Sequence, residues 1–346
     1  MNVCINTRNL SSDLTGVQRY TLELLARIGD HVERISPSKE MAGIKGHMWE
    51  QFILPQKLRG CLLFSPSNTG PLIVRNQVVT IHDFAALDHP EWLNPRFAAW
   101  YGFIIPRLAA RVAHIITISE FSKQRLLSHV RMSEDRITVI PNGVDPRFYP
   151  MDDFELSAQL RHLDLPSRSY VLCVGSLEPR KNLHRLIQAW AQVQSDIPRD
   201  VWLVITGKRS NRRVFASIAG LDDLPPRVHL TGHVEEEILT ALYSGALIFA
   251  YPSLYEGFGL PPLEAMASGV PVLTGNQASL PEVVGQAGIM VDPFNVDAIA
   301  DGLTQLINNF SLREQMRIAG LERARRFSWD ITAAKTVSVL QRIGSS

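Results

Sequence analysis

The sequence predicts an α/β protein built from two domains. Its 346 residues are enough for about two domains of ordinary size, each with its own hydrophobic core. Short apolar runs alternate with glycine-containing loops and amphipathic stretches, a pattern typical of buried strands followed by helices. Residues 146–169 are polar and punctuated by prolines, so we place the first domain in residues 1–150, a linker in 151–168 and the second domain in 169–329.

Composition and charge exclude several classes of protein. Hydrophobic residues make up 45% of the chain and charged residues 20%, which excludes a disordered or coiled-coil protein. The formal net charge is only +1, so we expect no nucleic-acid partner. The chain has no N-terminal signal pattern and no run of about 18 apolar residues, so we expect a cytoplasmic protein without a membrane span.

The cysteines and acids give no sign of a metal site. Cys4, Cys61 and Cys173 lie in apolar runs, and their spacing is not that of metal ligands. They are expected to be three buried, free thiols of a cytosolic protein. The sequence also lacks an Asp-x-Asp motif for a divalent cation. We therefore expect no metal.

The most informative part of the sequence is a strand, a loop and a helix in the second domain. Residues 246–250 are continuously apolar, which predicts a strand buried on both faces, and Gly257 and Gly259 end it. Pro261 and Pro262 suit the first turn of a helix, which strong helix formers then continue. Backbone N–H groups of the loop and the helix dipole both favour an anion at such a place. We therefore expect this loop to bind phosphate.

Two carboxylates flank the loop, Glu256 at its start and Glu264 in the following helix. A carboxylate binds phosphate poorly but accepts hydrogen bonds from hydroxyl groups. Acids on either side of an anion site therefore indicate a ligand with both phosphates and sugars, such as a nucleotide sugar. The alternative is that Glu264 only complements the helix N-terminus, an effect of about 0.3–1 kcal/mol, and that Glu256 is a solvated loop residue.

The same residues resemble a known signature. Residues 256–264 read EGFGLPPLE and are followed by AMASGVPV, so acids, glycines, prolines and a downstream Gly-Val-Pro occur at fixed spacing. This segment resembles the signature of retaining family 4 glycosyltransferases of the GT-B fold. The resemblance implies two Rossmann-like, doubly wound domains that face each other across a cleft. It also implies that the C-terminal helix, residues 330–346, crosses back to the N-terminal domain.

The first domain contributes two candidate residues. Gly16 lies between the first strand and an amphipathic helix, and it resembles the family's N-terminal glycine loop, which lies near the donor phosphates and the acceptor. Residues 78–83 end a buried strand in His82 and Asp83, and ligands bind at the carboxyl ends of strands in open α/β sheets. The resemblance implies that His82 contacts the donor sugar. The alternative is a structural histidine.

Residues 95–112 combine aromatic and aliphatic residues with Arg96, Arg107 and Arg111. The default prediction is a pair of core helices. The alternative is an apolar and basic patch that contacts an anionic membrane surface, which would suit a lipid-linked acceptor.

A basic turn follows the first strand of the second domain. Arg180 and Lys181 stand just ahead of a helix N-terminus, where cations are unfavourable unless an anion lies nearby. The resemblance implies contact with the donor diphosphate, although Ser176 stands where many family members have arginine. Val234, in a later turn, resembles a residue whose backbone contacts the nucleotide base. The alternative for Arg180 is an ordinary surface charge.

These features predict a glycosyl transfer reaction. The leaving diphosphate gains negative charge in the transition state, which basic side chains, amides and a helix dipole can stabilise without a metal. The catalytic candidates are His82, Glu256 and Lys181, and Glu264 is expected to hold the ribose. The candidate donor-binding residues are Gly16, Arg180, Lys181, Val234, Glu256, Gly257, Phe258, Gly259, Leu260 and Glu264.

Residues 175–182, GSLEPRKN, resemble bacterial mannosyltransferases of surface-polysaccharide assembly, which favours GDP-mannose as the co-substrate. The acceptor would be a glycan or a lipid-linked glycan, and a lipid-linked one would bring the protein to the cytoplasmic face of the inner membrane. Three alternatives stay open: a UDP-sugar-dependent glycosyltransferase, a sugar-nucleotide epimerase of GT-B-like fold, and a non-catalytic subunit that binds nucleotide sugars.

Overall fold

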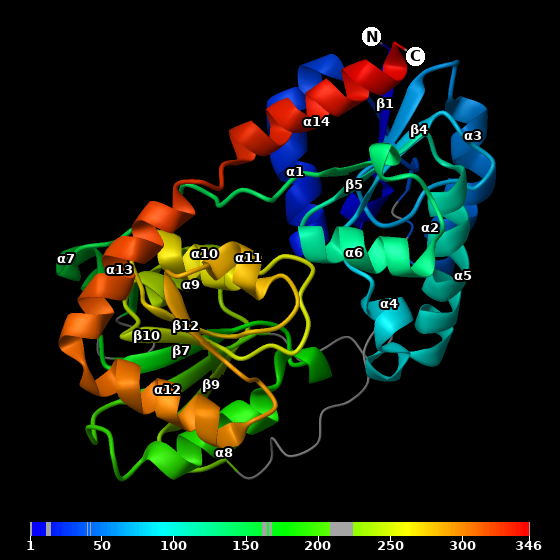
Figure 1. Ribbon diagram of the computed structural model, residues 1–346. Helices are drawn as coiled ribbons and strands as arrows, with labels where there is room; N and C mark the ends of the chain where they lie inside the picture. The colour runs from blue at the N-terminus through cyan, green and yellow to red at the C-terminus, as the bar shows by residue number, and fades with distance from the viewer. Residues whose placement is uncertain are drawn as a thin grey trace. The chain divides into compact units, whose positions relative to one another are not determined.

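The computed structural model describes residues 2–11, 15–39, 41, 43–160, 165, 168–207 and 224–345. The chain divides into two compact units (Figure 1). The first comprises Met1–Pro90, Pro95–Gly143 and Phe327–Ser346, and the second comprises Glu91–Asn94 and Val144–Arg326. Within the described residues each unit has one six-stranded parallel sheet with helices packed against it, which confirms the predicted α/β class.

The sheet of the first unit has its topological switch point near the start of the chain. Its strands are β1 (Val3–Asn6), β2 (Glu33–Ile35), β3 (Leu62–Ser65), β4 (Gln77–Ile81), β5 (His114–Thr117) and β6 (Ile137–Val139). Their order is β2-β1-β3-β4-β5-β6. The chain adds β2 on one side of β1 and the later strands on the other, so the switch point lies between β1 and β3.

The helices of the first unit include the one that ends the chain. They are α1 (Gly16–Ile28), α2 (Gly43–Met48), the π-helical turn η3 (Trp49–Ile53), α3 (Leu54–Lys57), α4 (Ala85–Asp88), α5 (Pro95–Arg111), α6 (Glu120–His129) and α14 (Trp329–Gly344). Helix α14 lies alongside α1 (Figure 1), where Arg27 Nε donates to Asp330 Oδ1 at 2.6 Å. The last helix therefore packs on the domain that begins the chain, as the resemblance implied.

Helix α5 covers the segment for which two interpretations were open. It is one continuous helix with Pro106 inside it, rather than a pair of helices. Its buried residues are Ala98, Ile104, Ile105, Leu108 and Ala109. The core interpretation is confirmed for this side of α5, while Phe103 and Arg107 are exposed on the other. No helix in the described part of the chain is both long and apolar enough to cross a membrane.

The prediction of three free thiols is wrong for one pair of cysteines. Cys4 in β1 and Cys61 just before β3 form a disulfide, with their Cα atoms 6.0 Å apart. The two strands are hydrogen-bonded neighbours, so the sheet brings together residues that are 57 positions apart in the chain. Sequence spacing alone cannot show such a pairing. Cys173 remains a free, buried thiol, and burial raises its pKa to about 12.

The second unit repeats the doubly wound arrangement. Its strands are β7 (Tyr170–Val174), β8 (Trp202–Thr206), β9 (Val228–Gly232), β10 (Ile248–Tyr251), β11 (Val272–Gly275) and β12 (Gly288–Val291). Their order is β12-β11-β10-β7-β8-β9, so the switch point lies between β10 and β7. Its helices are α7 (Asp153–Leu160), the short 3₁₀ turn η7 (Pro179–Lys181), α8 (Leu183–Val193), α9 (Glu236–Ser244), α10 (Leu260–Ala267), α11 (Leu280–Val284), α12 (Val296–Asn308) and α13 (Phe310–Ala324).

Part of the segment expected to be a linker, residues 151–168, is helical. Helix α7 lies in it, and its Leu156 and Leu160 side chains are buried. The rest of the expected linker falls partly on residues 161–164, 166 and 167, which lie outside the described residues.

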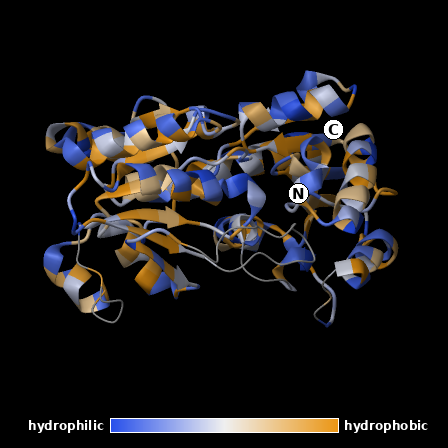
Figure 2. Ribbon diagram, turned by 90° about the horizontal axis from the view of Figure 1, so that it is seen from below, coloured by the Kyte–Doolittle hydropathy of each residue, from blue (hydrophilic) through white to orange (hydrophobic). Residues whose placement is uncertain are grey.

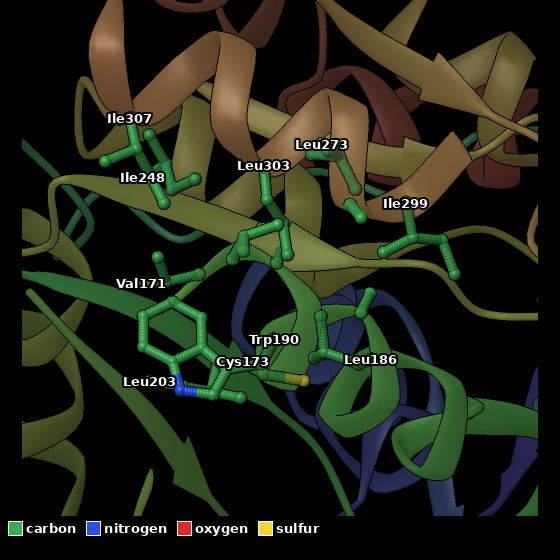
Figure 3. Packing of buried hydrophobic residues seen from close by; sticks show 14 of the residues in the cluster. Val171, Cys173, Leu186, Trp190, Leu203, Ile248, Leu273, Ile299, Leu303 and Ile307 are labelled. Carbon is green, nitrogen blue, oxygen red and sulfur yellow. The ribbon is translucent and has the colours of Figure 1, made fainter. Parts of the chain in front are cut away.

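The core of the second unit packs its helices against its sheet. Trp190 of α8, Leu303 of α12 and Val171 of β7 belong to one buried cluster, and their side chains gather on one face of the sheet (Figure 3). In Figure 2 the strands are mostly hydrophobic, while the helices carry both hydrophobic and hydrophilic residues. Burial of the strands on both faces is typical of parallel sheets.

Candidate active site

Two loops of the second unit meet at its topological switch point. β7 and β10 are hydrogen-bonded neighbours in the middle of the sheet. The chain leaves β7 toward β8 on one side and leaves β10 toward β11 on the other, so the two loops diverge at the carboxyl ends of the strands. Ligands of open α/β sheets bind at this place. The loop after β7 carries Arg180 and Lys181, and the loop after β10 carries Glu256.

The carboxylate of Glu256 joins the two loops. Its Oε1 accepts hydrogen bonds from Lys181 Nζ at 2.7 Å, from the Tyr251 hydroxyl at 2.8 Å and from Ser253 Oγ at 2.8 Å. Its Oε2 accepts from Arg180 Nη1 at 2.7 Å. The residue is only 6% exposed, so it is not the solvated loop acid that the alternative interpretation described.

Glu256 is ionised at all ordinary pH values. Burial alone would raise its pKa, but the charges of Arg180 and Lys181 and the hydrogen bonds from Lys181 and Ser253 outweigh burial and lower the pKa to about 2. The neighbouring Tyr251 hydroxyl keeps its proton, because burial and then the Glu256 charge raise its pKa. Glu256 can therefore accept hydrogen bonds from a ligand but cannot serve as a proton donor near neutral pH.

A second buried carboxylate, Glu178, was not predicted from the sequence. It is 1% exposed, and its Oε1 lies 2.9 Å from Arg180 Nη2 and 3.9 Å from Lys181 Nζ. Glu178 and Glu256 thus balance the charges of Arg180 and Lys181. These two carboxylates are the anions that stabilise Arg180 and Lys181 ahead of the N-terminus of helix α8. Arg180 is therefore not an ordinary surface charge.

The glycine loop ends where the prolines predicted. Helix α10 begins at Leu260, with its N-cap Gly259 in the left-handed region at φ 112°. An L-amino acid side chain at this φ would strain the backbone, and its Cβ atom would lie 2.9 Å from Leu280 Cδ2, which would have to move. Ser279 Oγ donates to the carbonyl oxygens of Glu256 at 2.9 Å and Phe258 at 2.7 Å. These bonds fix the backbone of the loop, including the buried Gly257.

Glu264 is held by a tyrosine that the sequence analysis missed. The Tyr243 hydroxyl donates to Glu264 Oε2 at 2.9 Å, and both residues are buried. Burial and then the Glu264 charge raise the pKa of Tyr243, so the hydroxyl stays protonated. Glu264 lies beyond the first turn of α10, so it does more than complement the helix N-terminus.

Three aromatic rings connect the two acids of the site. Tyr243, Phe249 and Tyr251 lie in a row, with ring centroids 5.4 Å and 5.7 Å apart. One tyrosine bonds Glu264 and the other bonds Glu256. Tyrosine within a buried apolar segment is the only signal in the sequence that could have indicated these partners, because a buried hydroxyl needs an acceptor.

Val234 is the one second-unit candidate that the structure does not bring into this group. It is half-buried and follows β9, which is two strands away from β7 at the edge of the described sheet. Within the described residues no group of three or more His, Cys, Asp and Glu side chains is arranged to hold a metal.

His82 and Gly16 belong to the first unit. His82 follows β4 and is 5% exposed; its Nε2 bonds the Pro66 carbonyl oxygen at 2.8 Å. Because a carbonyl only accepts, Nε2 carries the proton and Nδ1 is the nitrogen that could accept a bond from a ligand. Burial lowers the pKa of His82, so the ring is neutral near pH 7. Gly16 is the exposed first residue of α1, after the N-cap Thr15.

Comparison with known proteins shows which class has this architecture. A family model described as "Glycosyl transferases group 1" matches residues 161–323, and one described as "Glycosyltransferase Family 4" matches residues 71–148. The chain is 27% identical to O-antigen chain mannosyltransferase B of Escherichia coli, over 98% of this chain and 99% of that protein. It is 31% identical to the MMP alpha-(1->4)-mannosyltransferase of Mycolicibacterium hassiacum, over 72% of this chain and 60% of that protein.

A solved structure shares the fold. HepE from Anabaena, crystallised with UDP-glucose, superimposes with a TM-score of 0.77 at 17% identity, over 99% of this chain and 100% of that one. Fold, family models and relatives together define a glycosyltransferase of the GT-B fold. The chain belongs to glycosyltransferase family 4.

The low pKa of Glu256 predicts how stability depends on pH. Because the unfolded chain takes up the proton first, the free energy of unfolding should fall as pH drops from 4.5 toward about 2. Glu256→Gln removes this titration, so its free energy of unfolding should fall less steeply over the same interval. Urea unfolding at a series of pH values measures both slopes. The exposed Glu237→Gln serves as the control and should keep the wild-type slope; equal slopes for wild type and Glu256→Gln would contradict the assignment.

Proposed function

We propose that this glycosyltransferase moves mannose from GDP-mannose onto a glycan or lipid-linked glycan, with retention of the anomeric configuration and without a metal. The observation that carries the proposal is the bonded set of Arg180, Lys181 and Glu256 at the switch point of the second unit. The names of the two mannosyltransferase relatives support mannose as the sugar.

Donor binding would exchange the partners of the two cations. A diphosphate carries more charge than a carboxylate and offers more acceptor oxygens, so it competes with Glu256 for Arg180 and Lys181. Glu256 then turns its acceptor oxygens to the hydroxyls of the donor sugar. Because Tyr251 and Ser253 also hold the carboxylate, Glu256 stays in position during the exchange.

In the chemical step the leaving diphosphate gains negative charge, which Arg180 and Lys181 are placed to stabilise. The bond between sugar C1 and the diphosphate oxygen breaks, and that oxygen keeps the electron pair. The acceptor hydroxyl oxygen bonds C1 on the same face, and its proton passes to the leaving phosphate oxygen. Arg180, Lys181 and the α10 N-terminus stabilise the departing diphosphate. Glu264, held by Tyr243, would bind the ribose hydroxyls.

Two residues of the first unit are also proposed to contact the donor. His82, neutral and with Nδ1 as an acceptor, is proposed to contact the donor sugar, and the backbone at Gly16 is proposed to lie near the phosphates. Val234, two residues after the end of β9, remains the proposed backbone contact of the base.

The proposal that the donor nucleotide is GDP rests on the GSLEPRKN segment at residues 175–182. HepE, which binds UDP-glucose, shares only the fold with this chain, so it does not argue for UDP. A lipid-linked acceptor would place the protein at the cytoplasmic face of a membrane.

The proposal is tested by measuring the release of GDP from GDP-mannose in the presence of a chelator, with a bacterial lipid extract as acceptor and a panel of UDP-sugars for comparison. Lys181→Ala, Glu256→Ala and His82→Ala should each lower kcat/KM, the first two by about 100-fold or more, because each removes transition-state stabilisation. The exposed Glu237→Ala should match wild type. Release of UDP from a UDP-sugar, with no release of GDP from GDP-mannose, would show that the donor is a UDP-sugar. Formation of an altered sugar nucleotide in the absence of acceptor would favour the epimerase. Wild-type rates in both Glu256→Ala and His82→Ala would overturn the site.

The Tyr243–Glu264 bond predicts a change in donor affinity. Tyr243→Phe should raise the KM for the donor about three- to tenfold with kcat nearly unchanged, because one hydrogen bond of about 1 kcal/mol no longer positions Glu264. Steady-state kinetics measure the split. Tyr149→Phe is the matched control, since Tyr149 also donates to a glutamate, Glu155, but in an exposed pair. Unchanged KM in Tyr243→Phe would show that this bond does not position Glu264 for the donor.

A further inference from the structure

Glu178 is an acid at a place where an anion is expected to bind. It is 1% exposed, and its Oε1 lies 2.9 Å from Arg180 Nη2 and 3.9 Å from Lys181 Nζ, the two cations proposed to hold the donor diphosphate. A carboxylate beside these cations repels the ligand that they attract. The charge of Glu178 must therefore lower the affinity of this site for a diphosphate.

The two carboxylates of the site are held in different ways. Glu256 accepts hydrogen bonds from side chains of both loops. Glu178 forms a close ion pair with Arg180, but neither of its carboxylate oxygens accepts a hydrogen bond from the described residues. Glu178 therefore acts on Arg180 and Lys181 through its charge alone. A ligand that takes over the hydrogen bonds of Glu256 leaves that charge in place.

The backbone keeps Glu178 beside the cations. Glu178 is the N-cap of η7, and its carbonyl oxygen accepts from the Lys181 N–H at 3.1 Å. Pro179, the next residue, restricts the backbone of the turn. After the turn, the fully buried Asn182 donates from Nδ2 to carbonyl oxygens of the loops that follow β10 and β12, at 2.9 Å and 2.6 Å. Glu178 is therefore expected to stay in place when Glu256 turns toward a sugar.

The charges of the group explain how Glu178 affects a ligand. Arg180 and Lys181 carry two positive charges, and Glu178 and Glu256 carry two negative ones, so the four side chains are balanced. Water screens charges weakly in a buried group, so each of them acts strongly on its neighbours. Without the carboxylate of Glu178 the group would have an excess of one positive charge and would bind a diphosphate more tightly.

We propose that Glu178 limits the affinity of the site for the nucleoside diphosphate, so that this product leaves after transfer. Product release limits the turnover of many enzymes, and differences in affinity appear mostly in the rate of dissociation. Glu178 sets the affinity and takes no part in forming or breaking bonds. The inference rests on the proposed function in one respect, that the diphosphate binds Arg180 and Lys181.

The test is calorimetric titration of the full-length protein with GDP in the presence of a chelator. Glu178→Gln should bind GDP about tenfold more tightly than wild type and release it about tenfold more slowly, because one opposing charge is removed. Stopped-flow displacement of a fluorescent GDP analogue measures the release. Glu178→Ala also removes the charge and should show the same change, so the result does not depend on how glutamine fits. Glu178→Asp keeps the charge and should bind GDP like wild type.

Two controls separate the effect of charge from a change of shape. Guanosine has no phosphate, so it should bind equally to wild type and to Glu178→Gln. The matched control Glu314→Gln removes an acid that pairs with Arg317 at 3.0 Å on α13, and it should bind GDP like wild type. GDP affinity in Glu178→Gln and Glu178→Ala that is equal to wild type or weaker would overturn the inference. An equal gain in affinity for guanosine and GDP would overturn it too, because the change would then be one of shape.

Lys181→Ala tests the proposed function separately, since it should weaken GDP binding. Equal GDP affinity in Lys181→Ala and wild type would overturn the proposed diphosphate site and the inference together. Weaker binding in Lys181→Ala with no gain in Glu178→Gln would overturn the inference alone. Binding of UDP in place of GDP by wild type would overturn the proposed donor alone, and the comparison of Glu178→Gln with wild type then uses UDP.

Discussion

The ion pair between the Glu256 carboxylate and the Arg180 and Lys181 side chains is the interaction on which the site depends. Breaking a buried pair by removing one partner leaves an uncompensated charge, which typically costs about 3–5 kcal/mol. These three charged groups join two loops from different strands. Hydrogen bonds join the same loops, because the Leu254 N–H donates to the Arg180 carbonyl oxygen at 2.8 Å and Asn182 Nδ2 donates to the Pro252 carbonyl oxygen at 2.9 Å. A diphosphate would bind the same two cations. The same charges therefore contribute to the stability of the ligand-free protein and to its affinity for the donor.

The fold explains why these charges meet. In a doubly wound sheet, only the two strands at the switch point send their loops in opposite directions, and here those strands are β7 and β10. Phe249 and Tyr251 of β10 form a row of rings with Tyr243 of α9, and this row connects Glu264 to Glu256. Rigid, buried strands thus position acceptors for hydroxyls and donors for phosphates within one small region, which suits a ligand that carries both.

Sequence reasoning succeeded where the signal was local. Gly259 and the two prolines predicted the end of the loop and the start of α10, and the basic turn predicted an unusual charge environment. It failed where a contact joins distant elements, as in the Cys4–Cys61 disulfide and the Tyr243–Glu264 bond.

We propose that Arg180 and Lys181 exchange Glu256 for the diphosphate of the donor. A crystal structure of the protein with GDP-mannose and a chelator, without acceptor, tests it most directly. We expect diphosphate oxygens within hydrogen-bond distance of Lys181 Nζ and the Arg180 guanidinium, with Glu256 bonded to hydroxyls of the sugar. A diphosphate bound elsewhere, with the Glu256–Lys181 and Glu256–Arg180 pairs unchanged, would contradict it.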